Sequence, residues 1–347
     1  MARGRLHIFI IDGTLSRLHP EFETSAGLLY RLLEEGGPRA DQTYGYNPGI
    51  QGEGLGKWLR VAAGIGINLS VCHGYSVLCS RYRPGDRIML FGYSRGAYAV
   101  RSLAGFIGKI GLIRRQHATE RRVQRAFRYY ETERSNLHAR QFSDRYCHRD
   151  VPIEMIGVWD TVAALGLPYP VLNRLAPMAT AFHDHRLGPL IRNACQALAL
   201  DETRLSYTPI LWTCAPGWRG RLEQVWFAGA HSDVGGQVWR RPEARPLANI
   251  PFVWMLDRAE SLGLRLPDGW RDRYPGDPAA PMVGDRAGPG KLFLLREPRL
   301  IGQADAESIH PSVFARMEQL PDYRPRAYDP DNPTGIGPKT SEGHGRT

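Results

Sequence analysis

One serine in this sequence lies in a pattern that suits a nucleophile. Ser94 is flanked at two residues on either side by Gly92 and Gly96, in the order Gly-Tyr-Ser-Arg-Gly. A serine on a sharp turn between a strand and a helix presents its hydroxyl above the sheet. The two flanking positions must be small, because the turn brings them close to neighbouring backbone. We therefore predict that Ser94 attacks an ester carbonyl in an acyl-transfer reaction.

A serine hydroxyl needs a base to take its proton, and that base is usually a histidine oriented by a carboxylate. When the serine comes first along the chain, the acid and then the histidine follow it. Asp233 follows a buried strand and His310 immediately precedes a helix, so this pair is our first choice. Asp160, at the end of the strand after the elbow, and His231, in the Asp233 loop, remain the alternates.

The oxyanion formed during such an attack needs backbone N–H donors. The residue after the nucleophile, Arg95, begins a helix and supplies one N–H. The loop Gly13-Thr14, after the first apolar strand, is the predicted source of the second. The histidines have no His-Glu-x-x-His or related ligand spacing, so we predict neither a metal nor another cofactor.

Strands and helices alternate along the chain in a way that predicts an α/β fold. Short apolar runs indicate strands at 8–11, 88–91, 153–158 and 224–229, with further short strands at 209–214 and 291–295. Helical patterns occupy 25–35, 59–82, the stretch from about 97, 117–140, 191–200 and 250–262, with one more helix after His310. This order favours a mainly parallel sheet with helices on both faces, as in an α/β-hydrolase.

Two stretches lack a clear period. Residues 44–56 are glycine-rich and predict a loop. Residues 165–190 are rich in proline, leucine and histidine, which is typical of a lid inserted between core strands. We expect a single catalytic domain over 1–322 and a flexible tail over 323–347, where proline, glycine and aspartate dominate.

The overall composition narrows the class of protein. The 347 residues include 45 Lys and Arg against 35 Asp and Glu, a formal net charge of +10 that suits an anionic membrane surface. Basic patches interleaved with aromatic residues are not evident, which argues against nucleic acid as a binding partner.

Five cysteines without a close pair suggest a reducing compartment. Neither a signal peptide nor a transmembrane helix is evident, so we expect the protein in the cytoplasm of the producing cell.

Four motifs in the same order resemble one hydrolase family. They are Phe91-Gly-Tyr-Ser-Arg-Gly-Ala-Tyr98, Gly157-Val-Trp-Asp-Thr-Val162, Ala197-Leu-Ala-Leu-Asp-Glu-Thr-Arg204 and Trp226-Phe-Ala-Gly-Ala-His-Ser-Asp-Val-Gly-Gly236. The family is an α/β-hydrolase domain of bacteria and fungi that includes the catalytic domains of type VI secretion phospholipase effectors. The resemblance covers about residues 7–318.

The resemblance implies phospholipase A or esterase activity on glycerophospholipids, with Ser94 as the nucleophile. It also implies delivery to a target cell envelope, with a secretion spike and an immunity protein as partners. Two alternatives remain open. One is an intracellular carboxylesterase that acts on small soluble esters, and the other is an inactive hydrolase fold that serves as a binding module.

Overall fold

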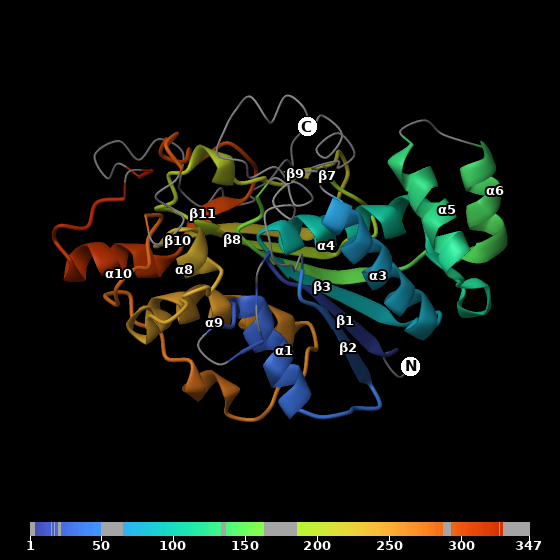
Figure 1. Cartoon of the computed structure of the whole chain (residues 1–347), viewed down its shortest axis with the longest axis horizontal. Helices are drawn as coiled ribbons and strands as arrows, with labels where there is room; N and C mark the ends of the chain where they lie inside the picture. Colours follow the sequence, from blue (N-terminus) through green and yellow to red (C-terminus); the bar gives the residue numbers. More distant parts are fainter. Residues whose placement is uncertain are drawn as a thin grey trace, which may run out of the picture.

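A seven-stranded sheet forms the centre of the protein (Figure 1). The computed structural model describes residues 4–328 except 15, 17, 20–21, 50–64, 133–136, 163–185, 287–292 and 326. All neighbouring strands of this sheet pair in parallel, in the order β11-β10-β8-β6-β3-β1-β2. In chain order they are β1 (Leu6–Ile11), β2 (Gln42–Asn47), β3 (Arg87–Tyr93), β6 (Ile153–Trp159), β8 (Asn193–Ala199), β10 (Arg221–Phe227) and β11 (Glu307–Ile309).

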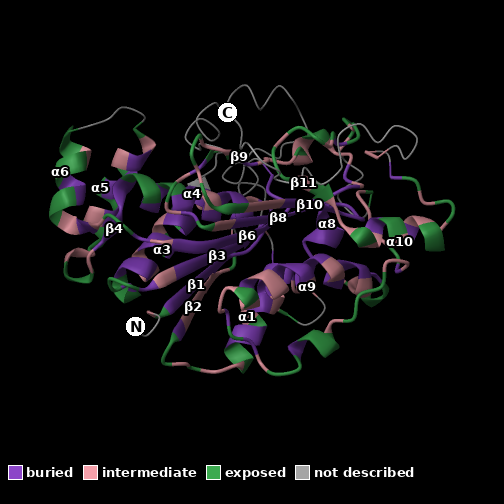
Figure 2. Cartoon of the chain, turned by 180° about the vertical axis from the view of Figure 1, so that it is seen from behind, coloured by how far each residue is buried: buried purple, intermediate pink, exposed green. Residues whose placement is uncertain are grey.

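Helices cover both faces of the sheet, because successive side chains of its central strands point to opposite faces and nearly all of them are buried. From β1, Ile8 and Ile10 pack with α1 (Ser25–Glu35) and α9 (Arg245–Ser261), while Phe9 and Ile11 face α3 (Ile65–Arg81) and α4 (Arg95–Ile110). Figure 2 shows the central strands buried between these two layers. A sheet covered on both faces is typical of parallel α/β folds. The α/β-hydrolase fold class predicted from the sequence is confirmed.

Smaller elements complete the described part of the chain. The helices are α5 (Glu120–Glu131), α6 (Leu137–Tyr146), α8 (His231–Val234) and α10 (Pro311–Gln319), with 3₁₀ turns at Arg115–His117, Leu205–Tyr207, Pro242–Ala244 and Trp270–Arg273. Two strand pairs lie outside the main sheet: β4 (Leu112–Ile113) with β5 (Cys147–His148), and β7 (Arg186–Leu187) with β9 (Thr213–Cys214).

The helix predicted over 191–200 is wrong, because this stretch forms the central strand β8. Its alanines have high helix propensity, but β8 lies between β6 and β10 and is buried along nearly its whole length. Tertiary packing therefore decides its conformation. The glycine-rich stretch predicted as a loop from residue 44 begins instead with strand β2, and residues 293–295 form no strand.

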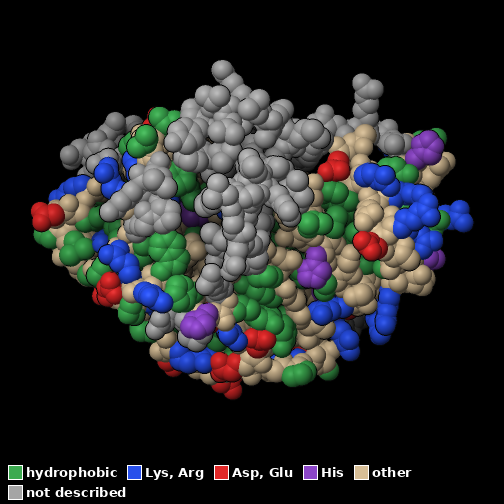
Figure 3. All heavy atoms as spheres, in the orientation of Figure 1, with side chains coloured by type: hydrophobic (Ala, Val, Ile, Leu, Met, Phe, Trp, Pro, Cys, Tyr) green, Lys and Arg blue, Asp and Glu red, His purple; other side chains and the backbone are tan. Residues whose placement is uncertain are grey.

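The arginine-rich helix predicted over 117–140 is two helices, α5 and α6, with residues 133–136 between them. Val123, Ala126, Phe127 and Tyr130 form the buried side of α5, and its arginines lie on the other side. Figure 3 shows many Lys and Arg side chains toward the edge where these two helices lie, with acidic side chains elsewhere on the same face. This distribution agrees with a solvated helix face.

The predicted lid falls outside the described residues except for 186–190, which include β7. Most of the predicted tail, 323–347, also falls outside them. None of the helices in the described residues has the length and apolar character that crossing a bilayer requires.

Candidate active site

Ser94 occupies a strained turn between β3 and α4. Its φ of 58° and ψ of −123° lie outside the regions that residues with a side chain prefer. Its N–H donates to the carbonyl of Trp159 at 3.0 Å, which ties the turn to the end of β6. Only 8% of the Ser94 residue is exposed, and it lies at the carboxyl edge of the sheet, where parallel α/β folds place their sites.

The two glycines beside Ser94 are required by close packing, as the sequence predicts. A Cβ on Gly92 would lie 2.6 Å from the carbonyl oxygen of Gly96. A Cβ on Gly96 would lie 2.1 Å from the carbonyl oxygen of Ile11. The first turn of α4 therefore packs directly on the end of β1, and this contact sets the height of the Ser94 hydroxyl above the sheet.

His231 connects Ser94 to Asp160. Its Nε2 lies 2.9 Å from Ser94 Oγ, and its Nδ1 lies 2.6 Å from Asp160 Oδ2. Because a carboxylate only accepts, Nδ1 carries the hydrogen and Nε2 is free to accept from the serine hydroxyl. This unbroken chain of hydrogen bonds is the arrangement in which a histidine can act as general base toward a serine.

Asp160 follows β6 and also has a positive φ, of 42°. Its side chain is fully buried. Oδ1 accepts from the N–H of Ala199 at 3.0 Å, and both oxygens accept from the guanidinium of Arg299, at 2.6 and 2.8 Å. Burial by itself raises the pKa of the Asp160 carboxyl, but the charge and hydrogen bonds of Arg299 and His231 outweigh it and hold that pKa well below its ordinary value.

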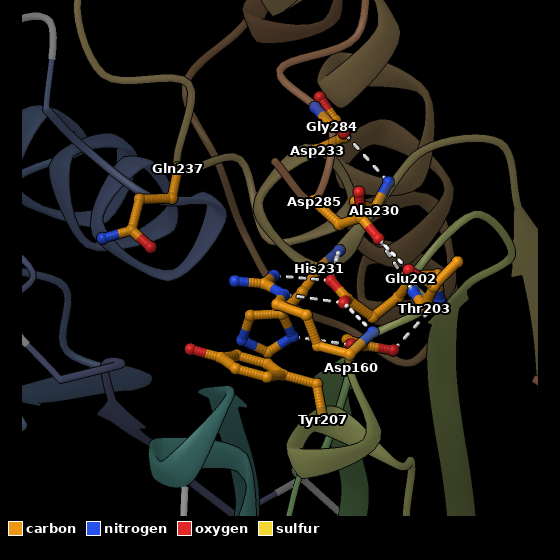
Figure 4. Close-up of polar contacts among 12 residues, drawn as sticks. Asp160, Glu202, Thr203, Tyr207, Ala230, His231, Asp233, Gln237, Gly284 and Asp285 are labelled. Atoms are coloured by element: carbon orange, nitrogen blue, oxygen red, sulfur yellow. Dashed lines mark hydrogen bonds and ion pairs between the residues drawn. The ribbon is translucent and has the colours of Figure 1, made fainter. Parts of the chain in front are cut away.

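Two tyrosine rings hold the His231 imidazole. Tyr93 stacks against it with ring centroids 4.8 Å apart, and the edge-to-face Tyr207 ring lies at the same distance. Figure 4 shows the Tyr207 ring beside the imidazole and Asp160. Burial lowers the pKa of His231, and the Asp160 carboxylate opposes this shift. The imidazole is therefore neutral, and able to accept a proton, at neutral pH.

A buried ion pair supports this arrangement. Glu202 accepts from Arg204 Nε at 2.7 Å and from the backbone N–H of His231 at 3.2 Å. The Arg204 guanidinium lies over the Tyr207 ring, 3.9 Å from its centroid. Glu202 thus fixes the start of α8, and Arg204 holds Tyr207 against the imidazole.

Asp233 and His310, our first choice from the sequence, do not take part in this chain. Asp233 accepts from the N–H groups of Ala230, Val283 and Gly284, so its carboxylate caps the short helix α8 and anchors a loop. In Figure 4 it lies beside Ala230 and Gly284, apart from Asp160. His310 caps α10: its Nδ1 accepts from the N–H of Ser312, and its ring stacks on Phe227 at 4.6 Å. The structure brings the alternates, Asp160 and His231, to Ser94 in place of Asp233 and His310.

This difference from the sequence ranking follows from the misassigned strand. With 191–200 interpreted as a helix, Asp233 follows the second strand after the elbow strand. With β8 in place, β10 is three strands away from β3, while β6, which ends at Asp160, is the direct neighbour of β3. Asp160 therefore lies beside the elbow. His231 is the first residue of α8, and its imidazole lies at the same edge of the sheet.

Of the three residues predicted to supply oxyanion donors, Arg95 and Thr14 remain candidates and Gly13 does not. Arg95 is the first residue of α4, so its N–H has no intrahelical acceptor. The N–H of Gly13 donates to Asp12 Oδ1 at 2.6 Å, so Gly13 is not a free donor and that prediction is corrected. Thr14 remains: it lines a small cavity of about 10 Å³ together with Arg95, and its Oγ1 is buried without a partner among the described residues.

Asp12 gives the Gly13–Thr14 loop its shape. Its fully buried carboxylate accepts from the hydroxyls of Ser16 and Thr24 at 2.8–2.9 Å and from Tyr46 at 2.6 Å. Burial raises the pKa of this carboxyl, and the hydrogen bonds oppose the rise.

Within the described residues, no group of three or more His, Cys, Asp and Glu side chains is arranged to hold a metal ion.

The sequence belongs to a known family. The family described as "T6SS, Phospholipase effector Tle1-like, catalytic domain" matches residues 5–258. The chain is therefore a member of the Tle1-like phospholipase effector catalytic domain family, which confirms the resemblance seen in its motifs.

Individual relatives are distant. An uncharacterized protein of Saccharomyces cerevisiae, YEL023C, is 28% identical over 239 residues, which are 61% of this chain and 33% of the yeast protein. The chain thus spans about a third of that relative.

Solved structures are similar to part of the chain. An uncharacterized protein from Pseudomonas aeruginosa has a TM-score of 0.43 at 16% identity, over 78% of this chain and 48% of that one. The Tle1 effector bound to the VgrG spike of the type 6 secretion system has a TM-score of 0.36 at 19% identity, over 68% and 52%. The thermophilic esterase Est2 from Thermogutta terrifontis has a TM-score of 0.40 at 11% identity, over 77% and 85%.

Sequence reasoning assigned no role to several residues of the site. Arg299 lies in a proline-flanked stretch without a motif, far along the chain from Asp160. Tyr207 contacts the imidazole, and Glu202 the backbone N–H of His231, because β8 is a strand that ends beside the end of β10. Asp12 adjoins the predicted oxyanion loop, and its position at a strand end is the signal that could have identified it.

Proposed function

We propose that this protein is a serine carboxylic-ester hydrolase with Ser94 as nucleophile, His231 as general base and Asp160 as the acid that orients the base. The single observation that carries the proposal is the hydrogen-bond chain from Ser94 Oγ through both ring nitrogens of His231 to Asp160. The strained elbow of Ser94 and the neutral, buried imidazole support it.

In this mechanism His231 Nε2 takes the proton of Ser94 as Oγ attacks the ester carbonyl. The imidazolium that forms is stabilised by Asp160 through the Nδ1–H, and it returns the proton to the leaving alcohol. The N–H groups of Arg95 and Thr14 are the proposed donors to the oxyanion. Removal of one such donor costs about 3 kcal/mol of transition-state stabilisation in related chemistry. Water then attacks the acyl-enzyme with His231 again as base.

We propose that the substrate is a glycerophospholipid, cleaved at an acyl ester. Family membership supports this, and so does an apolar surface near the base. Leu205, Leu294 and Leu295 are 47%, 81% and 47% exposed, and Leu205 donates its N–H to the carbonyl of Leu295. This surface adjoins Tyr207, which contacts His231, and Phe293, which packs edge-to-face on Tyr207. Exposed leucines beside the site suit contact with acyl chains of a bilayer.

The first experiment compares hydrolysis of a fluorogenic phospholipid in vesicles with that of a short p-nitrophenyl ester, using wild type and single alanine variants. Loss of both activities in Ser94→Ala, His231→Ala and Asp160→Ala, with activity kept in Asp233→Ala and His310→Ala, is the expected result. Activity on the short ester alone favours a carboxylesterase of small soluble esters. If folded wild type neither turns over substrate nor reacts with a fluorophosphonate probe, the enzyme proposal fails and a binding module replaces it.

A second experiment tests the lipid surface. The double variant Leu294→Asp/Leu295→Asp should lose activity on vesicles at least tenfold and keep activity on the short ester. Leu137→Asp is the matched control, because Leu137 is 66% exposed and belongs to α6, which lies at the other side of the protein in Figure 1 from α8, the helix that carries His231. Equal loss in the control, or no loss in the double variant, would contradict a lipid-binding role for this surface.

Delivery to a target cell is a separate proposal that rests on the family. We propose export by a type VI secretion system, with a spike protein as carrier and an immunity protein in the producing cell. The measurement is the amount of the protein in the medium of cells with and without a functional secretion apparatus. Equal amounts in the two cultures would count against delivery by this route.

A further inference from the structure

The Asp160 carboxylate accepts hydrogen bonds from two side chains, those of His231 and Arg299. The imidazole of His231 approaches Oδ2 at 2.6 Å. The guanidinium of Arg299 approaches the far side with two parallel hydrogen bonds, Nη1 to Oδ1 at 2.6 Å and Nη2 to Oδ2 at 2.8 Å. Asp160 Oδ2 is therefore shared between an arginine and the base, and a fork of this kind fixes the plane of a carboxylate.

The arginine is itself fixed in place. Its two terminal nitrogens also donate to the carbonyls of Ala199 at 2.8 Å and Tyr207 at 2.6 Å, and only 6% of the residue is exposed. The segment around Arg299 is tied to the end of β8 by the N–H of Glu297, which donates to Thr203 at 2.7 Å. Arg299 therefore holds Asp160 and the backbone of Tyr207, the ring that packs on His231, at the same time.

We propose that Arg299 is a positioning residue for ester hydrolysis, a proposal that rests on the proposed triad. Arg299 orients the Asp160 carboxylate toward the base and partly neutralises its negative charge. This keeps His231 unprotonated in mildly acidic solution. Nothing in the family match bears on this residue, because the matched stretch ends at residue 258.

The other titratable groups around the imidazole do not replace this effect. Tyr93 from β3 presents a ring face to His231, and Tyr207 presents a ring edge, so these contacts are aromatic rather than ionic. Glu202 and Arg204 have opposite charges and pair with each other at 2.7 Å, so their effects on the imidazole largely cancel. The carboxylate charge that acts on His231 is then mainly that of Asp160, and Arg299 is its counter-ion.

The direction of the effect follows from electrostatics. A carboxylate without a counter-ion stabilises an imidazolium more strongly and is itself more easily protonated. Removal of the guanidinium therefore raises the pKa of both His231 and Asp160. Either change moves the acidic limb of the rate profile to higher pH, because the rate requires a neutral imidazole beside an ionised carboxylate.

The test is the pH dependence of kcat/KM on a short p-nitrophenyl ester for Arg299→Gln, Arg299→Lys and wild type. In Arg299→Gln we expect the acidic limb to move up by roughly one pH unit, a loss of about tenfold at pH 6. Arg299→Lys keeps the charge without the fork, so its limb should lie between the other two. Arg296→Gln is the matched control: Arg296 lies in the same segment but pairs with Asp285 at 2.7 Å, and its limb should not move.

Two results would overturn the proposal. One is an acidic limb in Arg299→Gln that coincides with that of wild type. The other is an Arg299→Lys variant with the wild-type profile and rate, which decides the matter if Arg299→Gln does not fold. The proposed function is tested separately by Ser94→Ala in the same assay, because an active Ser94→Ala refutes the triad, whereas an inactive one with unchanged Arg299 variants refutes only the role of Arg299.

Discussion

Replacing Asp160 by asparagine tests the site most sharply, because the change is isosteric and the contacts are known on every side. The carboxylate accepts from the N–H of Ala199, from both terminal nitrogens of Arg299 and from the Nδ1–H of His231. An asparagine has one oxygen and one NH₂ group, and the NH₂ group cannot accept. Because both oxygens accept from Arg299, the arginine loses one acceptor in either orientation of the amide.

Either orientation of the amide damages the site. If the NH₂ group faces His231, Nδ1 must accept, the hydrogen moves to Nε2, and the imidazole can no longer take the proton of Ser94. If it takes the place of Oδ1 instead, it meets the N–H of Ala199 and Nη1 of Arg299, so donor faces donor at both contacts. In either orientation the negative charge that stabilises the imidazolium is lost. In other serine hydrolases this substitution lowers kcat by about 10⁴, equivalent to about 5 kcal/mol. Leaving a buried charge without its partner costs roughly 3–5 kcal/mol of stability.

The assay is kcat on a short p-nitrophenyl ester, with thermal unfolding followed on the same preparations. Asp233→Asn is the matched control, since Asp233 is also a buried aspartate after a strand and accepts only from backbone N–H groups. It should lower Tm and leave the kcat of the folded protein within about threefold of wild type. A kcat within tenfold of wild type in Asp160→Asn, or a larger kcat loss in Asp233→Asn, would refute the assignment.

Three further predictions concern the scaffold. Gly96→Ala should prevent folding or lower the free energy of unfolding by more than about 3 kcal/mol, because its Cβ would lie 2.1 Å from the carbonyl oxygen of Ile11. In the control Gly108→Ala, on the same helix, the new Cβ meets nothing within 4 Å, so thermal unfolding should show a neutral or stabilising effect. Burial lowers the pKa of His310 to about 4, so the unfolded chain binds a proton at this position before the folded protein does as the pH falls from 6.5. In urea unfolding, the contribution of His310 to the free energy of unfolding should therefore fall by about 1–2 kcal/mol down to pH 4 and stay constant below it, seen as the difference between wild type and His310→Asn, which keeps a capping side chain. Asp12→Ala removes the shared acceptor of four donors and should lower stability by about 3 kcal/mol or more, seen as a lower Tm, while an unchanged Tm would contradict the network.

Local sequence is enough to predict the strand, turn and helix around Ser94. The apolar run into Tyr93, the glycines at 92 and 96 and the helical spacing that follows are local, and local sterics leave few alternatives for such a strand, turn and helix. The same reasoning limited the acid and the base to four candidates, because each of them stands next to the end of a strand or the start of a helix.

Which of these candidates contact one another depends on the long-range packing of the chain. The alanine-rich stretch 193–199 forms a strand because both its faces are covered by other layers, and that non-local burial overrides its helix propensity. Its presence sets the strand order that brings Asp160 beside Ser94 and leaves Asp233 to cap α8. Arg299 reaches Asp160 across 139 residues of sequence, and no local pattern encodes a contact that depends on where a distant segment returns to the sheet edge.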